Sequence, residues 1–416
     1  MKPIVFTDAI LFDGETYFPH TRYSVRVERQ RIVDVFDGTV EVGNDIDVVH
    51  LDGALLMPGL IDAHTHANIP TLNIAGLSNW PVSLVSQHAR HFLEGMLQRG
   101  FTTVRDAGGA DIGLVQAIEA GLIDGPRFYI AGRALSQTGG HGDLRGRTVF
   151  PTCSCNHVGF VSEVVDGVDE IRKAVREQFR QGVSQVKIMV SGGVLSPTDP
   201  IWMNQFSDDE ISVAVEEASR WRAYVMAHAH TAEAALRCAR LGVRSIEHGT
   251  MIDRETAARI ADTDAFVVPT LSAIESIRRD RHAIPAELFD KLQVVSDTAY
   301  AAIEHCHAAG VKIGLGSDLL GLSQGGESEE LILRSGLMPT LDILRSATRI
   351  NGELVHRDSD LGVIRAGALA DLIVLDKNPF VNLDVFGDVA RNVTFVMKDG
   401  RVYKDTRNRM PAPQSV

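Results

Sequence analysis

The sequence predicts an α/β fold, and three observations carry this prediction. Short apolar runs alternate with amphipathic stretches through the middle of the chain, about eight times in about 300 residues. At both ends, strand-like runs and turn residues replace the helical periodicity. No G-x-G-x-x-G loop follows the first strand, which disfavours a doubly wound open sheet. We therefore predict a (β/α)8 TIM barrel over residues 58–358, with a small discontinuous β-sandwich domain built from residues 1–57 and 359–416.

The N-terminal segment, up to about residue 56, predicts a small β unit. Its apolar or alternating runs are separated by turn signals such as Asp13-Gly14 and Asp37-Gly38. The runs are Ile4–Phe6, Tyr23–Val27, Ile32–Phe36 and Val48–Leu51.

The barrel elements follow in order along the chain. The first strand lies in the stretch Met57-Pro-Gly-Leu-Ile-Asp-Ala-His-Thr-His66 and ends in the two histidines. The other strands are expected at Phe101–Val104, Arg127–Ala131, Gln185–Val190, Ala223–Ala227, Arg244–Ile246, Ala265–Pro269 and Val311–Leu315. The clearest helices are expected at Pro81–Arg99, Asp169–Arg180, Asp208–Arg220, Thr231–Arg240 and Ala286–Ala309. Ser207 and Glu210 predict a capping box for one of them.

Strand character returns after about residue 360. Gly362–Asp376 and Val393–Val402 have strand-turn patterns, and Asp399-Gly400 is a hairpin signal. We expect these strands to pair with those of the N-terminal segment. The tail from Asn408 to Val416 contains two prolines and is expected to be loose.

Composition limits the classes of partner. The formal net charge is −13, which disfavours nucleic acid or an anionic membrane surface as the main partner. No apolar run is long enough to cross a bilayer, and residues 1–13 lack a signal-peptide pattern, so a cytoplasmic protein is expected. Four cysteines, two of them at Cys153 and Cys155, do not form a secreted disulfide framework. The net charge says little about a small-molecule substrate, because a site can hold local positive charge inside an acidic protein.

Potential metal ligands recur where the predicted strands end. His64 and His66 lie two residues apart, so on a strand both imidazoles point to the same side. Taken singly, each residue has an ordinary structural explanation, such as a satisfied histidine or a helix cap. In a barrel, however, the carboxyl ends of all strands meet at one mouth, and joint occurrence by chance is improbable. The full set is His64, His66, Lys187, His228, His248 and Asp318.

This pattern resembles the amidohydrolase superfamily over most of the chain. The resemblance implies two Zn²⁺ ions bridged by a carboxylated Lys187. His64, His66 and Asp318 would hold one ion, and His228 and His248 the other. A bridging hydroxide would attack, and Asp318 would carry its proton to the leaving amine. A lysine among apolar neighbours favours the neutral amine, which can add carbon dioxide.

The loop Ser136-Gln-Thr-Gly-Gly-His-Gly-Asp143 narrows the resemblance. It lacks the lysine-serine ending of a phosphate loop. Its Gly-Gly-His-Gly-Asp string resembles the prolidase-like and imidazolonepropionase-like branch, which implies that His141 binds the scissile carbonyl oxygen. The alternative is that His141 only pins the loop.

A substrate from this branch has a free carboxylate that needs a binding partner. His230 and Arg145 are our candidates, with Arg133 and Arg147 as further ones. For His230 the alternative is support of the metal ligands, and for the arginines it is a solvated surface.

We therefore expect a binuclear zinc hydrolase that releases a C-terminal amino acid from a dipeptide or an N-acyl amino acid. The alternative on the same scaffold is hydrolysis of a cyclic amide or lactone, as in imidazolonepropionase-like or hydantoinase-like enzymes. Deamination is disfavoured by Lys187, because deaminases of this superfamily commonly lack the bridging lysine. A non-catalytic scaffold is disfavoured because no ligand is missing. Relatives imply a homo-oligomer, and the insertion at residues 144–166 suggests a lid or an oligomer contact.

Overall fold

The computed structural model describes residues 2–38, 43, 45–146, 157–158, 161–196 and 198–407. The chain divides into two compact units. The first consists of Met1–Ile61, Glu94–Thr102 and Thr340–Val416, and the second of Asp62–Leu93 and Thr103–Pro339. The predicted Arg147, Cys153, Cys155 and the tail from Asn408 lie outside the described residues.

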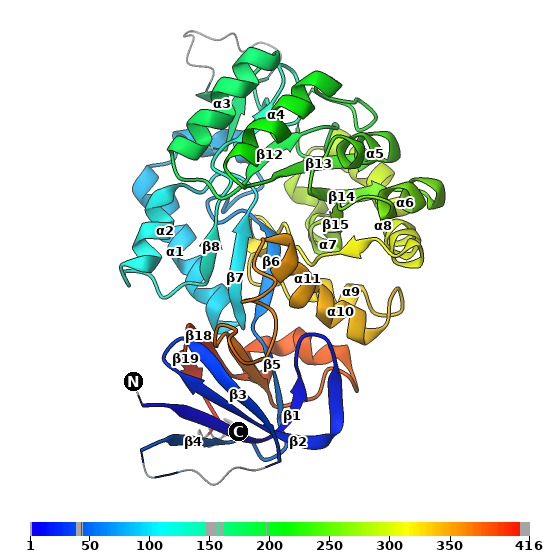
Figure 1. Ribbon diagram of the computed structural model, residues 1–416. Helices are drawn as coiled ribbons and strands as arrows, with labels where there is room; N and C mark the ends of the chain where they lie inside the picture. The colour runs from blue at the N-terminus through cyan, green and yellow to red at the C-terminus, as the bar shows by residue number, and fades with distance from the viewer. Residues whose placement is uncertain are drawn as a thin grey trace. The chain divides into compact units, whose positions relative to one another are not determined.

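Strands from both ends of the chain form one sheet in the first unit. In this eight-stranded sheet, β5 pairs antiparallel with β17, and Leu56 lies opposite Val374. Figure 1 shows these blue N-terminal strands beside the orange and red C-terminal ones. The strands are β1 (Ile4–Phe12), β2 (Tyr17–Glu28), β3 (Arg31–Asp37), β4 (Asp47–His50), β5 (Leu55–Pro58), β17 (Leu372–Leu375), β18 (Val393–Lys398) and β19 (Arg401–Asp405). The order is β19-β18-β17-β5-β1-β2-β3, and β4 also pairs with β1.

An apolar cluster packs against this sheet. Phe6 of β1 and Phe395 of β18 meet edge to face, with ring centroids 5.3 Å apart. Both rings are buried and pack with Leu56 and Val374 in one cluster. Each such side chain contributes about 1.5–3 kcal/mol of burial free energy. The predicted pairing of N-terminal with C-terminal strands is thus present, with its core drawn from both.

The predicted hairpin at Asp399-Gly400 is confirmed. Lys398 pairs with Arg401 across a two-residue turn, and both turn residues have positive φ, 50° and 72°. A side chain at Gly400 would lie 1.6 Å from the Arg29 carbonyl oxygen, so only glycine fits there.

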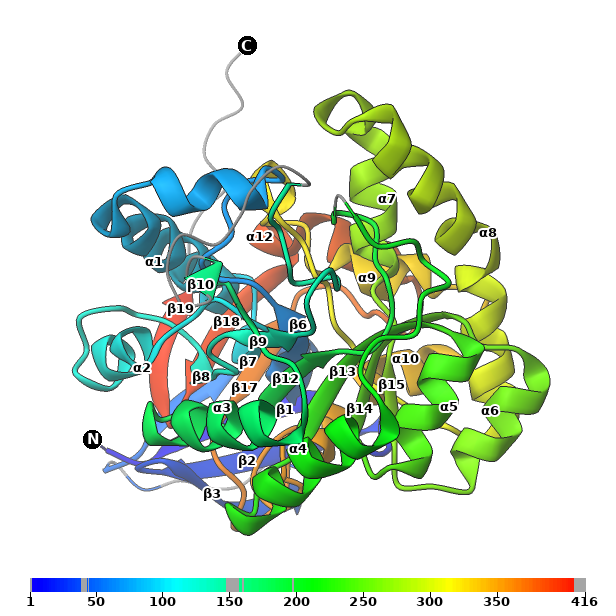
Figure 2. The ribbon, with the colours of Figure 1, turned by 90° about the horizontal axis from the view of Figure 1, so that it is seen from above.

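Parallel strands form two sheets that belong mainly to the second unit. One has the order β6-β7-β8, and the other β10-β11-β9-β12-β13-β14-β15-β16. All pairs from β9 to β16 are parallel. Figure 2 shows β12 to β15 side by side. The strands are β6 (Leu60–Thr65), β7 (Phe101–Asp106), β8 (Arg127–Tyr129), β9 (Ala134–Ser136), β10 (His157–Val158), β11 (Ser162–Val164), β12 (Val186–Met189), β13 (Val225–Thr231), β14 (Ser245–Met251), β15 (Phe266–Val268) and β16 (Lys312–Ile313).

Helices follow most of these strands. They are α1 (Val82–Gln98), α2 (Ile112–Glu119), α3 (Val168–Arg180), α4 (Asp208–Arg220), α5 (Ala232–Arg240), α6 (Arg254–Ala261), α7 (Leu271–Arg279), α8 (Ala286–Ala309) and α9 (Glu329–Leu333). The first unit contains α10 (Thr340–Ser346), α11 (Arg349–Leu354) and α12 (Val389–Asn392). Short 3-10 helices are η1 (Ile74–Asn79), η2 (Arg281–Ala283), η3 (Gly321–Ser323) and η4 (Leu383–Asp388). None of the described helices is long and apolar enough to cross a membrane.

Local signals placed these elements well, and the capping box shows why. The Ser207 side chain accepts from the backbone N–H of Glu210, and the Glu210 side chain accepts in return from the backbone N–H of Ser207. Two otherwise unpaired donors are satisfied, so α4 begins at the predicted residue. The strands β9 and β11 were not predicted, because three-residue strands between loops carry too little periodicity.

Two backbone hydrogen bonds bring the first strand of the second unit to the segment after β16. Ala63 N–H donates to the Leu315 carbonyl at 2.9 Å, and Asp318 N–H donates to the His64 carbonyl at 2.8 Å. These bonds place residues from opposite ends of the unit's sequence beside each other.

Candidate metal centre

One cavity gathers the predicted site residues apart from the arginines: its described lining lacks Arg145 and Arg133, and Arg147 is outside the described residues. Its lining includes His64, His66, His141, Lys187, His228, His230, His248 and Asp318. The empty volume, with the open mouth included, is about 910 Å³.

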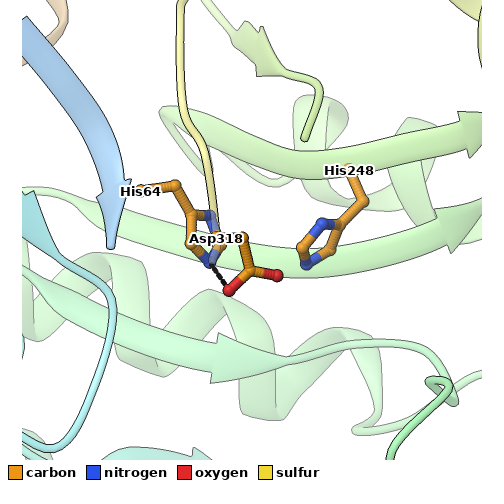
Figure 3. A group of neighbouring side chains, drawn as sticks. All are labelled: His64, His248 and Asp318. Atoms are coloured by element: carbon orange, nitrogen blue, oxygen red, sulfur yellow. Dashed lines mark ion pairs between the residues drawn. The ribbon is translucent and has the colours of Figure 1, made fainter. Parts of the chain in front are cut away.

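The end of β6 and the segment after β16 provide the first group of candidate ligands. His64 Nε2 lies 3.5 Å from Asp318 Oδ1, and His66 Nε2 lies 3.3 Å from the same oxygen. Figure 3 shows the carboxylate of Asp318 between His64 and His248. His64 lies in β6 and His66 directly follows its last residue, Thr65, and both rings approach the same oxygen of Asp318, so they point to one place as predicted.

Neighbouring parallel strands provide the second group. His228 of β13 and His248 of β14 have ring centroids 4.7 Å apart. Lys187 of β12 is 1% exposed. Burial lowers the pKa of its ammonium to about 8. At pH 7 a group with this pKa is a neutral amine in roughly one molecule in ten, far more often than an ordinary lysine.

The second ring nitrogens of His64 and His66 are already engaged. Nδ1 of His64 lies 2.6 Å from Glu247 Oε2, and Nδ1 of His66 lies 2.8 Å from the Gly108 carbonyl oxygen. Such partners fix the tautomer and the orientation of a metal-binding imidazole. Nε2 is thus the nitrogen that each of these rings offers to a cation.

The other two imidazoles are held in the same way but through different nitrogens. Nδ1 of His248 lies 2.7 Å from Thr270 Oγ1, which leaves Nε2 for a metal. Nε2 of His228 lies 3.2 Å from the Gly192 carbonyl oxygen, which leaves Nδ1. Burial keeps the pKa of both rings well below the ordinary value, so both are neutral, as metal ligands must be.

Sequence reasoning missed the buried ion pair behind His64. Arg105 of β7 donates to Glu247 Oε1 at 2.9 Å, and neither side chain is exposed. Although burial opposes it, the charge of Arg105 together with His64 holds the pKa of Glu247 at about 2. The available signal was two charged residues inside otherwise apolar strands.

Two further buried carboxylates were also missed. Asp62 accepts from the Ser317 hydroxyl at 2.6 Å and from the His64 backbone N–H at 2.9 Å. Asp106 accepts from the backbone N–H groups of Ala67 and Gly108, at 2.8 and 2.9 Å. Asp62 thus ties the segment after β16 to β6, and Asp106 ties the residues after β6 to those after β7.

The backbone is unusual at two of the candidate ligands. His248 and Asp318 have φ of 72° and 51°, in the left-handed region that residues other than glycine rarely adopt. Strained residues of this kind persist where surrounding contacts hold them, often at functional sites. A side chain at Gly316 would lie 2.6 Å from Cβ of His64, so glycine lets the Asp318 segment pass β6.

The residues present fit a metal site by geometry and by chemistry. Ligand atoms of His64, His248 and Asp318 all lie within 4.8 Å of one another. The prediction assigned His64 and Asp318 to one ion and His248 to the other, so these three residues combine candidate ligands of both ions. The assignment of ligands to two separate ions stays a prediction.

The predicted substrate-binding residues differ in their surroundings. His230 lines the cavity, and its Nδ1 lies 2.9 Å from Thr250 Oγ1. Arg145 instead forms a two-point ion pair with Asp143, with both distances 2.6 Å. It is absent from the described lining, and its binding role stays a prediction.

Part of the cavity lining is aliphatic. Helix α7 begins directly after Thr270, the partner of His248, and turns Ala273, Ile274 and Ile277 toward the cavity. Helix α8 adds Leu292 and Val295. We refer to these five residues as the apolar wall. An apolar group of a ligand gains free energy by leaving water here.

Comparison with known sequences gives a consistent picture. A model of the amidohydrolase family matches residues 55–403. Ochratoxinase from Aspergillus niger is 34% identical over 369 residues, which covers 84% of this chain and 76% of the relative.

Solved structures extend the similarity to the whole fold. A prolidase in complex with N-methylphosphonate-L-proline is 42% identical, with a TM-score of 0.93 over 97% of this chain and 100% of that chain. A Xaa-Pro dipeptidase with methionine bound in its active site is 28% identical, with a TM-score of 0.87 over 97% of this chain and 100% of that chain.

Proposed function

Because the chain belongs to the amidohydrolase family, we propose that it is a metal-dependent hydrolase of amide bonds. It releases a C-terminal amino acid from a dipeptide or an N-acyl amino acid. The observation that carries the proposal is the convergence of four histidines, one lysine and one aspartate on one cavity. Similarity to a prolidase and to a Xaa-Pro dipeptidase supports a peptide-like substrate.

Two zinc ions would be held by His64, His66, His228, His248 and Asp318, with Lys187 between them. Such ions supply Lewis acidity and lower the pKa of water toward neutrality. The lowered pKa of Lys187 supports its conversion to a carbamate. In that step the neutral amine adds carbon dioxide and loses one proton, which leaves a carboxylate-like anion suited to two cations.

The other residues act on protons and on the substrate. Burial opposes ionisation of Asp318, but His64 and His66 hold its pKa well below the ordinary value. Asp318 is therefore ionised, and in the proposed reaction it accepts the proton of the attacking water and passes it to the leaving amine. His141 contacts the scissile carbonyl oxygen, and His230 faces the carboxylate of the substrate.

The proposal includes a closed (β/α)8 barrel over residues 58–358 and a β-sandwich built from residues 1–57 and 359–416. The hydrogen bonds of Ala63 and Asp318 to the opposite segments support closure. Closure would bring the carboxyl ends of all strands to one mouth, where barrel enzymes have their active sites.

The apolar wall supports a substrate with an aliphatic or aromatic group next to the scissile bond. Among the described lining residues, Asp318 is the only carboxylate, and there is no arginine. A charged substrate side chain would therefore lack a partner along the wall and lose its hydration without compensation.

Metal analysis and a substrate panel test the proposal together. Protein purified without chelators should contain about two zinc ions per chain. The panel should compare Xaa-Pro dipeptides, other dipeptides, N-acyl amino acids and hydantoin-like rings. Hydrolysis of linear amides with apolar side chains is expected. A zinc-loaded protein that cleaves only the rings, or nothing in the panel, would contradict the proposal.

A further inference from the structure

We propose that Asp199 is a positioning residue which, together with Ser196, fixes the orientation of His141 in the cavity. The inference rests on the proposed function, because His141 is the group that contacts the substrate there. Nδ1 of His141 lies 2.9 Å from Ser196 Oγ and 3.7 Å from Asp199 Oδ2. Both partners come from the segment between β12 and α4, whereas His141 comes from the loop after β9.

Asp199 is too deeply buried to be an incidental neighbour. Its side chain is 2% exposed, and Oδ2 accepts from the Gly193 backbone N–H at 3.1 Å and from Gln205 Nε2 at 3.2 Å. Within the described part of the chain, Oδ1 is buried without a hydrogen-bond partner. A half-satisfied buried carboxylate costs stability, so its position calls for a role. A negative charge beside an imidazole provides one.

The hydrogen bonds around Ser196 show which atom of His141 is held. Lys291 Nζ donates to the Ser196 carbonyl at 2.9 Å and to Ser196 Oγ at 3.3 Å. The hydroxyl of Ser196 donates in turn to the Gly193 carbonyl at 3.2 Å. Its remaining capacity is to accept, so it receives the N–H at Nδ1 of His141. Nε2 is thus the ring atom left for the substrate.

Packing removes the remaining freedom of the His141 ring. The ring stacks on His228, with centroids 4.2 Å apart and planes 24° apart. A side chain at Gly193 would lie 2.1 Å from Cε1 of His141, so the ring rests directly on glycine backbone. The backbone N–H of His141 also donates to Gln205 Oε1 at 2.9 Å. Gln205 therefore links the backbone of His141 to Asp199.

A double-mutant cycle tests whether Asp199 acts through His141. Asp199→Ala should lower kcat/KM about 10- to 100-fold, mainly through kcat, with zinc content unchanged. In a His141→Ala background the same substitution should change activity little. Equal losses in both backgrounds would overturn the proposal. Asp199→Asn, which keeps the shape, replaces the alanine variant if that variant does not fold. Asp208→Asn, at an exposed aspartate of α4 that pairs with Arg237, is the matched control.

Crystal structures of the zinc-loaded wild type and of Asp199→Ala give a readout that does not depend on activity. We expect the His141 ring to leave Ser196 and to lose its stacking on His228 in the variant. An unmoved ring would overturn the positioning role even if activity falls. If the ring moves but the wild type cleaves none of the panel, the positioning role stands and the proposed function fails.

Discussion

The candidate ligand cluster and the apolar wall line the same cavity, but they are built by different forces. On the cluster side, each candidate ligand imidazole is held by a hydrogen bond to a partner such as Glu247, Gly108 or Thr270. On the wall, the aliphatic side chains of α7 and α8 are held by packing alone. Hydrogen bonds impose direction, whereas dispersion and the hydrophobic effect do not.

This difference predicts how each side tolerates change. A ligand that loses its orientation cannot share a cation, so substitutions in the cluster should remove function. A wall residue can change size and leave the cluster intact, so substitutions there should alter which substrates bind.

The largest loss of kcat/KM is expected from substitution of Lys187. Lys187→Ala removes the proposed bridge between the metals and should lower kcat/KM about a thousand-fold or more, equivalent to about 4 kcal/mol. Bound zinc, measured by metal analysis, should fall in parallel. Lys173→Ala, at an exposed lysine of α3, is the control and should leave both unchanged. A short carboxylic acid added to the Lys187→Ala protein should restore part of the activity if a carbamate is the bridging group. Full activity without any addition would end the bridging role.

An intermediate effect, on the stability of the folded protein, is expected from the ion pair between Glu247 and Arg105 behind His64. The pKa of Glu247 is about 2 in the folded protein, against an ordinary value of 4.5. This depressed pKa stabilises the folded state above pH 4.5, and that stabilisation is lost as the pH falls toward 2. The lowered pKa of Glu247 corresponds to roughly 3 kcal/mol of the free energy of unfolding.

Urea unfolding of the metal-free protein between pH 5 and pH 3 measures this loss. Glu247→Gln should be less stable overall, because Arg105 is left unpaired. Its free energy of unfolding should nevertheless depend less steeply on pH than that of the wild type. Parallel pH dependences would show that Glu247 is not the responsible group.

The smallest loss of kcat/KM is expected from substitutions in the apolar wall. Two adjacent valines of α8 provide a matched pair of positions for this test. Val295 is fully buried and lines the cavity, whereas Val294 is 47% exposed. Val295→Ala should lower kcat/KM for substrates with bulky apolar groups about 10-fold, with smaller substrates less affected. Val294→Ala should leave kcat/KM unchanged for both the bulky and the smaller substrates. If both variants changed the preference between bulky and smaller substrates equally, the apolar wall would have no role in selecting substrates.

Much of the fold could be predicted because its signals are local. The helix of α4 begins at a capping box, and the terminal hairpin turns at Asp399-Gly400, both as expected. The candidate metal ligands were also accessible, since polar residues that end apolar strands are conspicuous in a sequence. The short strand β9 left no such signal, and neither did the pairing of Arg145 with Asp143.

The sequence by itself determined which residues are candidates for the chemistry, because the kind of side chain and its place on a strand are local properties. Tertiary structure alone decided how those residues are supported. Glu247 reaches His64 across 183 positions of chain, and Asp199 reaches His141 across 58. Contacts between such distant positions depend on how strands and loops pack in space, which no local pattern records.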